Sequence, residues 1–281
     1  MNENLDLFEK VINKTIPKVD YVDIRGGNGN NTSIIMKDGE VQEINTGNSL
    51  GIRIRVLNNG AWGFAYTNDL SKLDEIAQTS IKISNSLKGD ESLSKADIIQ
   101  DKVSTDVKIP FSDVSIEEKK EIMSEASKAA SLKEVTSTTV SYSDSQSQEV
   151  ILSSEGTSIE MNTNRVAMFL NAAASDGTMM QLGHNSIGGV KGFEAISDED
   201  IEAFGRKIGE KAVRLLKAES APSGRFPIIA DPNLTGVFVH EALGHAVEGD
   251  LILQNDSILK DKLGSKIGSE IVNIYDDASL K

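Results

Sequence analysis

The feature that most constrains the fold is a series of short strand-like runs separated by tight-turn signals near the start of the chain. Asp38-Gly39 lies between two such runs, and Asn58-Asn59-Gly60 lies between two others. Because glycine accepts the positive φ angle that a tight hairpin turn requires, both signals predict antiparallel hairpins. The runs cover residues 21–25, 32–37, 40–45, 50–57 and 61–66.

Helical patterns flank these runs, and the order of elements is then repeated. A helix is expected to end at Pro17, and another is expected over residues 69–87. After a polar connector over residues 88–114, Ser115 and Glu118 have the spacing of a capping box. More strand-like runs follow over residues 135–180, and then a helix that Ser197 would cap.

The order of elements predicts an α+β fold with two consecutive units of antiparallel strands and flanking helices. We expect the first region at residues 1–110 and the second at 111–221. Ala221-Pro222-Ser223-Gly224 resembles a linker. A third region is expected to begin there and to cover residues 222–281.

Composition excludes several classes of function. The 281 residues include no cysteine, which excludes a disulfide-stapled domain, a cysteine nucleophile and an all-cysteine zinc site. The net charge of -14 argues against nucleic acid or anionic membrane as a partner. The first residues do not resemble a signal peptide, and no run approaches the ~20 apolar residues of a membrane span. We therefore expect a cytoplasmic protein.

Two of the three histidines lie in His240-Glu241-Ala242-Leu243-Gly244-His245, within a stretch with helical character. Neutral imidazoles are good zinc ligands, and a catalytic zinc ion has three protein ligands and a water molecule. The metal lowers the pKa of that water toward ~7, and a nearby carboxylate can take its proton. His240 and His245 are therefore candidate zinc ligands, and Glu241 is the candidate general base.

The spacing of the two histidines requires an irregular helix. At about 100° per residue, rings five positions apart point about 140° away from each other. Both can bind one metal ion only if the helix widens or breaks, as it does at a π-bulge. Because Gly244 makes such a distortion cheaper, we predict an irregular turn between Leu243 and Ala246.

Other assignments remain open. In a regular helix Glu241, His245 and Glu248 form one row that could bind a metal ion without His240, which would then be a core residue. His184 is a candidate substitute ligand, although a loop histidine is more often a surface residue. Carboxylates near the motif could orient the imidazoles or could be ordinary caps and surface charges: Asp231, Glu248 and Asp250.

Asp231 to Asp250 resembles the motif of the TldD/PmbA family of metallopeptidases, on its TldD side. The segments 63–66 and 189–194, together with Gly264, also resemble this family. The resemblance covers nearly the whole chain and implies that residues 222–281 begin a metallopeptidase region.

The resemblance implies that His240 and His245 bind Zn²⁺ and that Glu241 is the catalytic base. It implies hydrolysis of peptides or unfolded chains by metal-bound hydroxide, in a homodimer or a heterodimer with a PmbA-like subunit. The family's third zinc ligand is a downstream cysteine, which has no counterpart here, so the C-terminal region is expected to be incomplete. The alternatives are a truncated or inactive paralogue that binds a peptide or partner without cleaving it, and a metal hydrolase that uses the Glu241–His245–Glu248 row on a non-peptide substrate.

Overall fold

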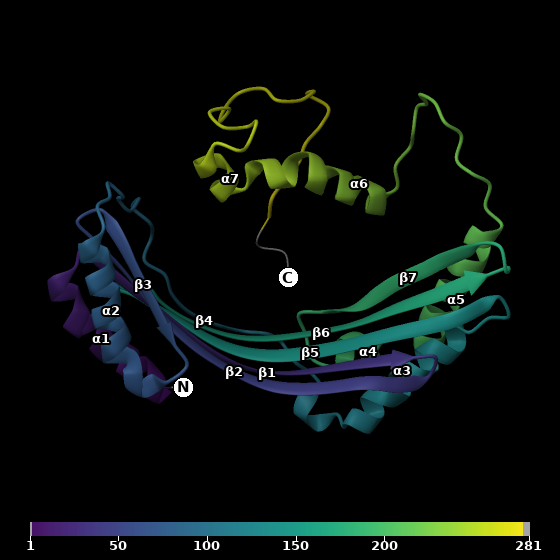
Figure 1. The fold of residues 1–281 in the computed structure, drawn as a ribbon, viewed down its shortest axis with the longest axis horizontal. Helices are drawn as coiled ribbons and strands as arrows, with labels where there is room; N and C mark the ends of the chain where they lie inside the picture. Colours follow the sequence, from purple (N-terminus) through teal and green to yellow (C-terminus); the bar gives the residue numbers. More distant parts are fainter. Residues whose placement is uncertain (1, 278–281) are drawn as a thin grey trace. The chain divides into compact units, whose positions relative to one another are not determined.

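The computed structural model describes residues 2–277. The chain divides into two compact units, Met1–Glu219 (unit 1) and Ser220–Lys281 (unit 2). Unit 1 is a sheet with helices, and unit 2 contains short helical segments and the two histidines of the motif (Figure 1).

The strands of unit 1 form one sheet, which confirms the predicted α+β class with antiparallel strands. The strand order is β3-β2-β1-β5-β6-β4, and β7 also pairs with β6. Strand pairs are antiparallel except that of β4 with β6. The strands are β1 (Tyr21–Lys37), β2 (Glu40–Asn58), β3 (Ala61–Thr67), β4 (Gln100–Ser104), β5 (Val135–Ser153), β6 (Ser158–Ser175) and β7 (Met180–Gly189).

Helices cover one face of this sheet in two groups, one toward each end of the long strands (Figure 1). Each group encloses its own core, and single strands contribute to both: on β1, Ile24 belongs to one core and Ile34 to the other. The α-helices of unit 1 are α1 (Asn2–Thr15) and α2 (Leu73–Ser86) in one group, with α3 (Ile116–Ala130), α4 (Glu194–Ser197) and α5 (Ile201–Leu216) in the other.

Strand β1 is continuous where the sequence predicts two separate strands. The two predicted strands end at residue 25 and begin again at residue 32, and the run between them, residues 26–31, consists entirely of glycine and asparagine. In the structure the run lies within β1. A Cβ atom at Gly26 would lie 2.5 Å from the Phe8 ring, so glycine here lets α1 pack closely against the sheet.

Local signals account for several element boundaries. Asp38 and Gly39 have positive φ angles of 52° and 82°, which confirms the predicted hairpin between β1 and β2. Ser115 and Glu118 form the predicted capping box of α3. The cap of α5 is Asp200 rather than Ser197, because Ser197 ends the short helix α4 and a turn separates it from α5.

The segment predicted as a connector contains β4, which pairs in parallel with β6. Each β4 residue is exposed, and Lys102 and Glu160 form an ion pair across the two strands at 3.2 Å. This polar strand lacks the apolar alternation by which strands are recognised in sequence. Within residues 2–277, no helix is long and apolar enough to cross a bilayer.

Glu194 ties the end of this connector to the loop after β7. Its buried carboxylate accepts hydrogen bonds from the backbone N–H groups of Ile109 (2.9 Å), Gly192 (3.0 Å) and Lys108 (3.2 Å). Burial by itself would raise the pKa of the Glu194 carboxyl, but these hydrogen bonds outweigh it and lower the pKa below its ordinary value. The glycine loop at residues 188–192 therefore has a structural role.

We expect Glu194→Gln to destabilise unit 1 by about 1–3 kcal/mol at pH 7, because the amide nitrogen would face backbone N–H donors. A lowered folded-state pKa stabilises the fold above the unfolded pKa, and this contribution is lost as pH falls through the folded pKa. The difference between wild type and variant should therefore shrink on acidification below about pH 4.5. Urea denaturation at pH 7 and pH 4 measures it, with exposed Glu199→Gln as the control. A difference that is independent of pH would contradict the assignment.

Candidate metal centre

The motif helix of unit 2 begins with α6 (Pro232–Val239). Its N-terminal cap is Asp231, whose side chain accepts a hydrogen bond from the backbone N–H of Leu234 at 2.8 Å. Pro232 follows at the first helical position, where a missing N–H costs nothing.

The helix widens at the motif, which confirms the predicted irregular turn. Residues His240–Gly244 form a π-helical turn (η4), and the backbone N–H of His245 donates to the carbonyl of His240 five residues earlier. A 3₁₀ turn (η5, His245–Val247) and helix α7 (Gly249–Gln254) follow. The irregular region is longer than predicted, since it begins at His240. The extra residue in the turn brings the two histidines to the same side of the helix.

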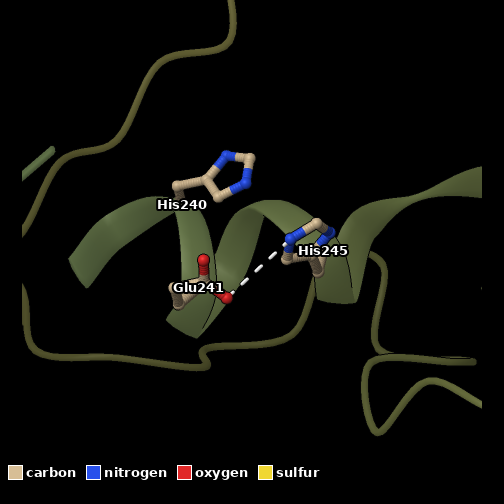
Figure 2. Close-up of side chains that lie close together, drawn as sticks. All are labelled: His240, Glu241 and His245. Carbon is tan, nitrogen blue, oxygen red and sulfur yellow. Dashed lines mark ion pairs between the residues drawn. The ribbon is translucent and has the colours of Figure 1, made fainter. Parts of the chain in front are cut away.

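The structure brings the three predicted site residues together (Figure 2). The rings of His240 and His245 lie 4.5 Å apart between centroids, edge to face. One potential ligand atom each of His240, Glu241 and His245 lies within 4.8 Å of the others. Among the described residues, these three form the one group of histidine, aspartate or glutamate side chains that lie this close together.

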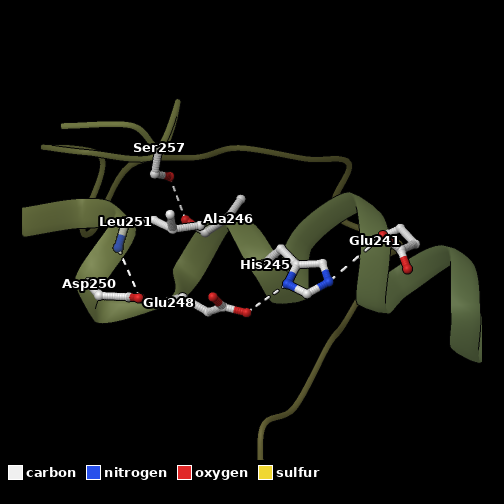
Figure 3. Close-up of polar contacts among 7 residues, drawn as sticks. All are labelled: Glu241, His245, Ala246, Glu248, Asp250, Leu251 and Ser257. Atoms are coloured by element: carbon white, nitrogen blue, oxygen red, sulfur yellow. Dashed lines mark hydrogen bonds and ion pairs between the residues drawn. The ribbon is translucent and has the colours of Figure 1, made fainter. Parts of the chain in front are cut away.

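Glu241 and Glu248 contact different nitrogens of the His245 ring (Figure 3). Glu248 Oε1 lies 2.6 Å from Nδ1, and Glu241 Oε2 lies 3.8 Å from Nε2. The hydrogen bond to Glu248 and its negative charge raise the pKa of His245. Because the two ring nitrogens point in different directions, Glu241 lies on the Nε2 side of the ring and Glu248 lies away from a metal ion held at Nε2. The geometry therefore favours the two-histidine site over the Glu241–His245–Glu248 row.

The remaining candidates have other positions. Asp231 caps α6, and Asp250 accepts a hydrogen bond from its neighbour Leu251 at 3.0 Å, so neither contacts the imidazoles. His184 lies on strand β7 of unit 1, stacked on Phe169 with 6.1 Å between ring centroids. It is thus a strand residue rather than the predicted loop residue.

Ser257 makes a hydrogen bond that the sequence does not predict. Its hydroxyl donates to the carbonyl of Ala246 in the 3₁₀ turn that follows the motif (Figure 3). The bond ties the segment after α7 to the histidine turn. A serine eleven residues away from its partner in a loop gives no local signal, so only the structure identifies it.

The donor set suits a divalent metal ion. Two imidazoles and a carboxylate are ligands that zinc accepts, and Glu248 fixes the His245 ring as an outer carboxylate does in metal sites. The side chains of His245 and Glu241 are 48% and 65% exposed, so a water molecule or a substrate can reach both. The described residues supply two imidazoles, whereas a catalytic zinc ion has three protein ligands.

Comparison with known proteins places this chain in a family. Three domain signatures match: PmbA/TldA metallopeptidase domain 1 at residues 22–84, the central domain at 109–216 and the C-terminal domain at 223–281. A protein of Methanothermobacter thermautotrophicus named a metalloprotease is 52% identical over 280 residues, which is 100% of this chain and 62% of the relative.

More distant relatives extend the comparison. A Saccharolobus solfataricus protein named a zinc metalloprotease TldD homolog is 28% identical and matches 80% of this chain and 49% of the relative. A solved structure from Bacteroides thetaiotaomicron, described as a candidate modulator of DNA gyrase, has a TM-score of 0.80 at 20% identity. That match covers 96% of this chain and 62% of the other, and it supports the fold alone. With all three domain signatures matched in order, the chain belongs to the PmbA/TldD metallopeptidase family.

Proposed function

We propose that this chain carries the zinc-binding segment of a peptidase, with His240 and His245 as metal ligands and Glu241 as the general base. The observation that supports this most directly is the π-helical turn. It places both imidazoles and the Glu241 carboxylate within 4.8 Å of one another. A distortion of this kind is costly in an ordinary helix and is common at functional sites.

Each residue has a distinct part in the proposed reaction. Bound zinc would polarise a peptide carbonyl and lower the pKa of a water molecule. Glu248 holds the His245 ring through Nδ1 and so leaves Nε2 available as the ligand atom. Glu241, on the Nε2 side of the ring, would accept a proton from the water and deliver it to the leaving amine.

The substrate and the assembly are part of the same proposal. The chain spans about 62% of the length of its Methanothermobacter relative. Peptidase activity of the full-length protein is therefore part of the proposal. We propose peptides or unfolded chains as substrates. We also propose a homodimer, or a heterodimer with a PmbA-like subunit, as the working assembly.

Metal content tests the ligand assignment. The chain should bind zinc, and His240→Ala and His245→Ala should each abolish measurable binding, because a single imidazole is left. Glu248→Ala should weaken binding by about 10–100-fold, the usual effect of removing an outer-shell partner. Zinc is measured after dialysis, and cleavage of a disordered peptide is followed with and without a chelator.

Two outcomes would contradict the proposal. If His240→Ala retained zinc while Glu248→Ala lost it, the ligands would be Glu241, His245 and Glu248. Zinc binding without cleavage, with or without a PmbA-like subunit, would favour the alternative of a protein that binds peptides or partners without catalysis.

A further inference from the structure

The face of the sheet opposite the helices carries an open groove over β3, β2, β1 and β5. Its volume is about 410 Å³, and it lies in unit 1, on residues outside the metal centre. The residues that matter for its chemistry are Arg25, Arg53, Phe64, Tyr66 and Glu149.

Successive cross-strand pairs between β1 and β2 differ in how their charges are balanced. Asp23 lies opposite Arg55, and the two form an ion pair at 2.8 Å. The next pair on this face is Arg25 opposite Arg53, which places two positive charges side by side. Like charges directly opposite each other destabilise a sheet, so this pair lacks the balance that its neighbour has.

Neither arginine of this pair has a partner within the part of the chain that the structure describes. No ion pair or hydrogen bond reaches either guanidinium among residues 2–277, and Arg53 Nε is buried without a hydrogen-bond partner. Arg55, two residues along the same strand, both pairs with Asp23 and stacks on Trp62 at 4.5 Å. A buried donor without a partner is costly, so the pair is suited to an anion from outside the chain.

Apolar and open surfaces adjoin the two arginines. Tyr66 lies opposite Arg53 on β3, with 76% of its surface exposed, and Phe64 is 45% exposed. Their rings lie 6.2 Å apart between centroids. The next β1–β2 pair is Gly27 opposite Gly51, and a Cβ atom at Gly51 would meet no atom within 4 Å. Gly51 therefore leaves room for a ligand beside the arginines, whereas the Glu149 side chain lies over Gly27.

We propose that this groove binds an acidic peptide segment. In the proposed complex, a carboxylate of the peptide lies between the guanidiniums of Arg25 and Arg53, and a neighbouring apolar side chain of the peptide packs on Phe64 and Tyr66. Glu149 on the β5 side can accept hydrogen bonds from peptide N–H groups, which a sugar–phosphate backbone does not offer. That the ligand is a peptide rests on the proposed function, whereas its negative charge follows from the arginine pair.

Binding to the chain in the presence of a chelator tests the groove separately from cleavage. The probe is a fluorescein-labelled peptide of alternating aspartate and leucine, followed by anisotropy at low salt. Arg25→Gln and Arg53→Gln should each weaken binding about tenfold or more, since a charged hydrogen bond contributes about 1.5–3 kcal/mol. Tyr66→Ala should also weaken it. The matched asparagine–leucine peptide should bind at least about tenfold more weakly than the acidic one.

The control is Arg165→Gln, which removes an exposed arginine from the same face outside the groove. It should change affinity by less than about twofold, and thermal unfolding should show that Arg25→Gln is folded. Equal losses in the control, unchanged affinity in both groove variants, or tighter binding of oligothymidine than of the acidic peptide would overturn the proposal. Cleavage of an uncharged peptide by the zinc-loaded chain is measured separately, so its failure would leave the groove result intact.

Discussion

Glu241→Gln is expected to leave zinc bound while cleavage of a disordered peptide falls by about 10²–10⁴-fold, the usual contribution of a general base. Glutamine keeps the size of the side chain but cannot accept a proton at neutral pH. The histidine turn should be undisturbed, because its backbone is held by the π-type hydrogen bond between His245 and His240 and by Ser257. The measurement pairs zinc content with the cleavage rate at saturating peptide.

A matched control in the same unit is Glu270→Gln. This glutamate is exposed and forms a surface ion pair with Lys266 at 2.7 Å, so its loss should leave cleavage unchanged. Loss of zinc in Glu241→Gln would show that Glu241 is a ligand rather than a base. Cleavage at the wild-type rate with zinc retained would place the base elsewhere.

The motif could be predicted closely because its constraint is local. Two histidines five residues apart cannot share a metal ion in a regular helix, so the sequence by itself predicts a widened turn, and the structure contains one. The role of Glu248 depends on which ring nitrogen of His245 faces Glu248 and which faces Glu241. Sequence spacing leaves that choice open, because it also permits Glu241, His245 and Glu248 to form one row.

The sheet was harder to predict for the opposite reason. Each hairpin follows from its own turn residues, but the joining of β1 to β5 pairs residues more than 100 positions apart, such as Asp23 with Ser153. The glycine-rich sequence within β1 resembles a turn. The structure shows that Gly26 instead makes room for the Phe8 ring, which lies close to the strand. The arginine pair of the groove is likewise invisible without register, because Arg25 and Arg53 become neighbours only when β1 and β2 align.

No sequence pattern predicts the buried ion pair between α3 and β5, because a lysine within a helix gives no signal that it is buried. Lys119 Nζ lies 2.7 Å from Asp144 Oδ2, and the two side chains are 4% and 6% exposed. The Tyr142 hydroxyl donates to the same carboxylate oxygen at 2.6 Å. Burial, together with this hydrogen bond to Asp144, raises the pKa of Tyr142, which therefore remains protonated as a donor.

Lys119→Met is expected to lower the free energy of unfolding of unit 1 by about 3–5 kcal/mol, because it leaves the Asp144 carboxylate buried without its cation. Lys128→Met, on the exposed side of the same helix, should cost less than about 1 kcal/mol. Adding Asp144→Asn to Lys119→Met should recover much of the loss, since the amide oxygen can still accept from Tyr142 and no charge is buried. Urea denaturation of five proteins measures these differences: wild type, Lys119→Met, Lys128→Met, Asp144→Asn and the double variant. If the double variant were as unstable as the sum of its single changes, the cost would come from packing rather than from the unpaired charge.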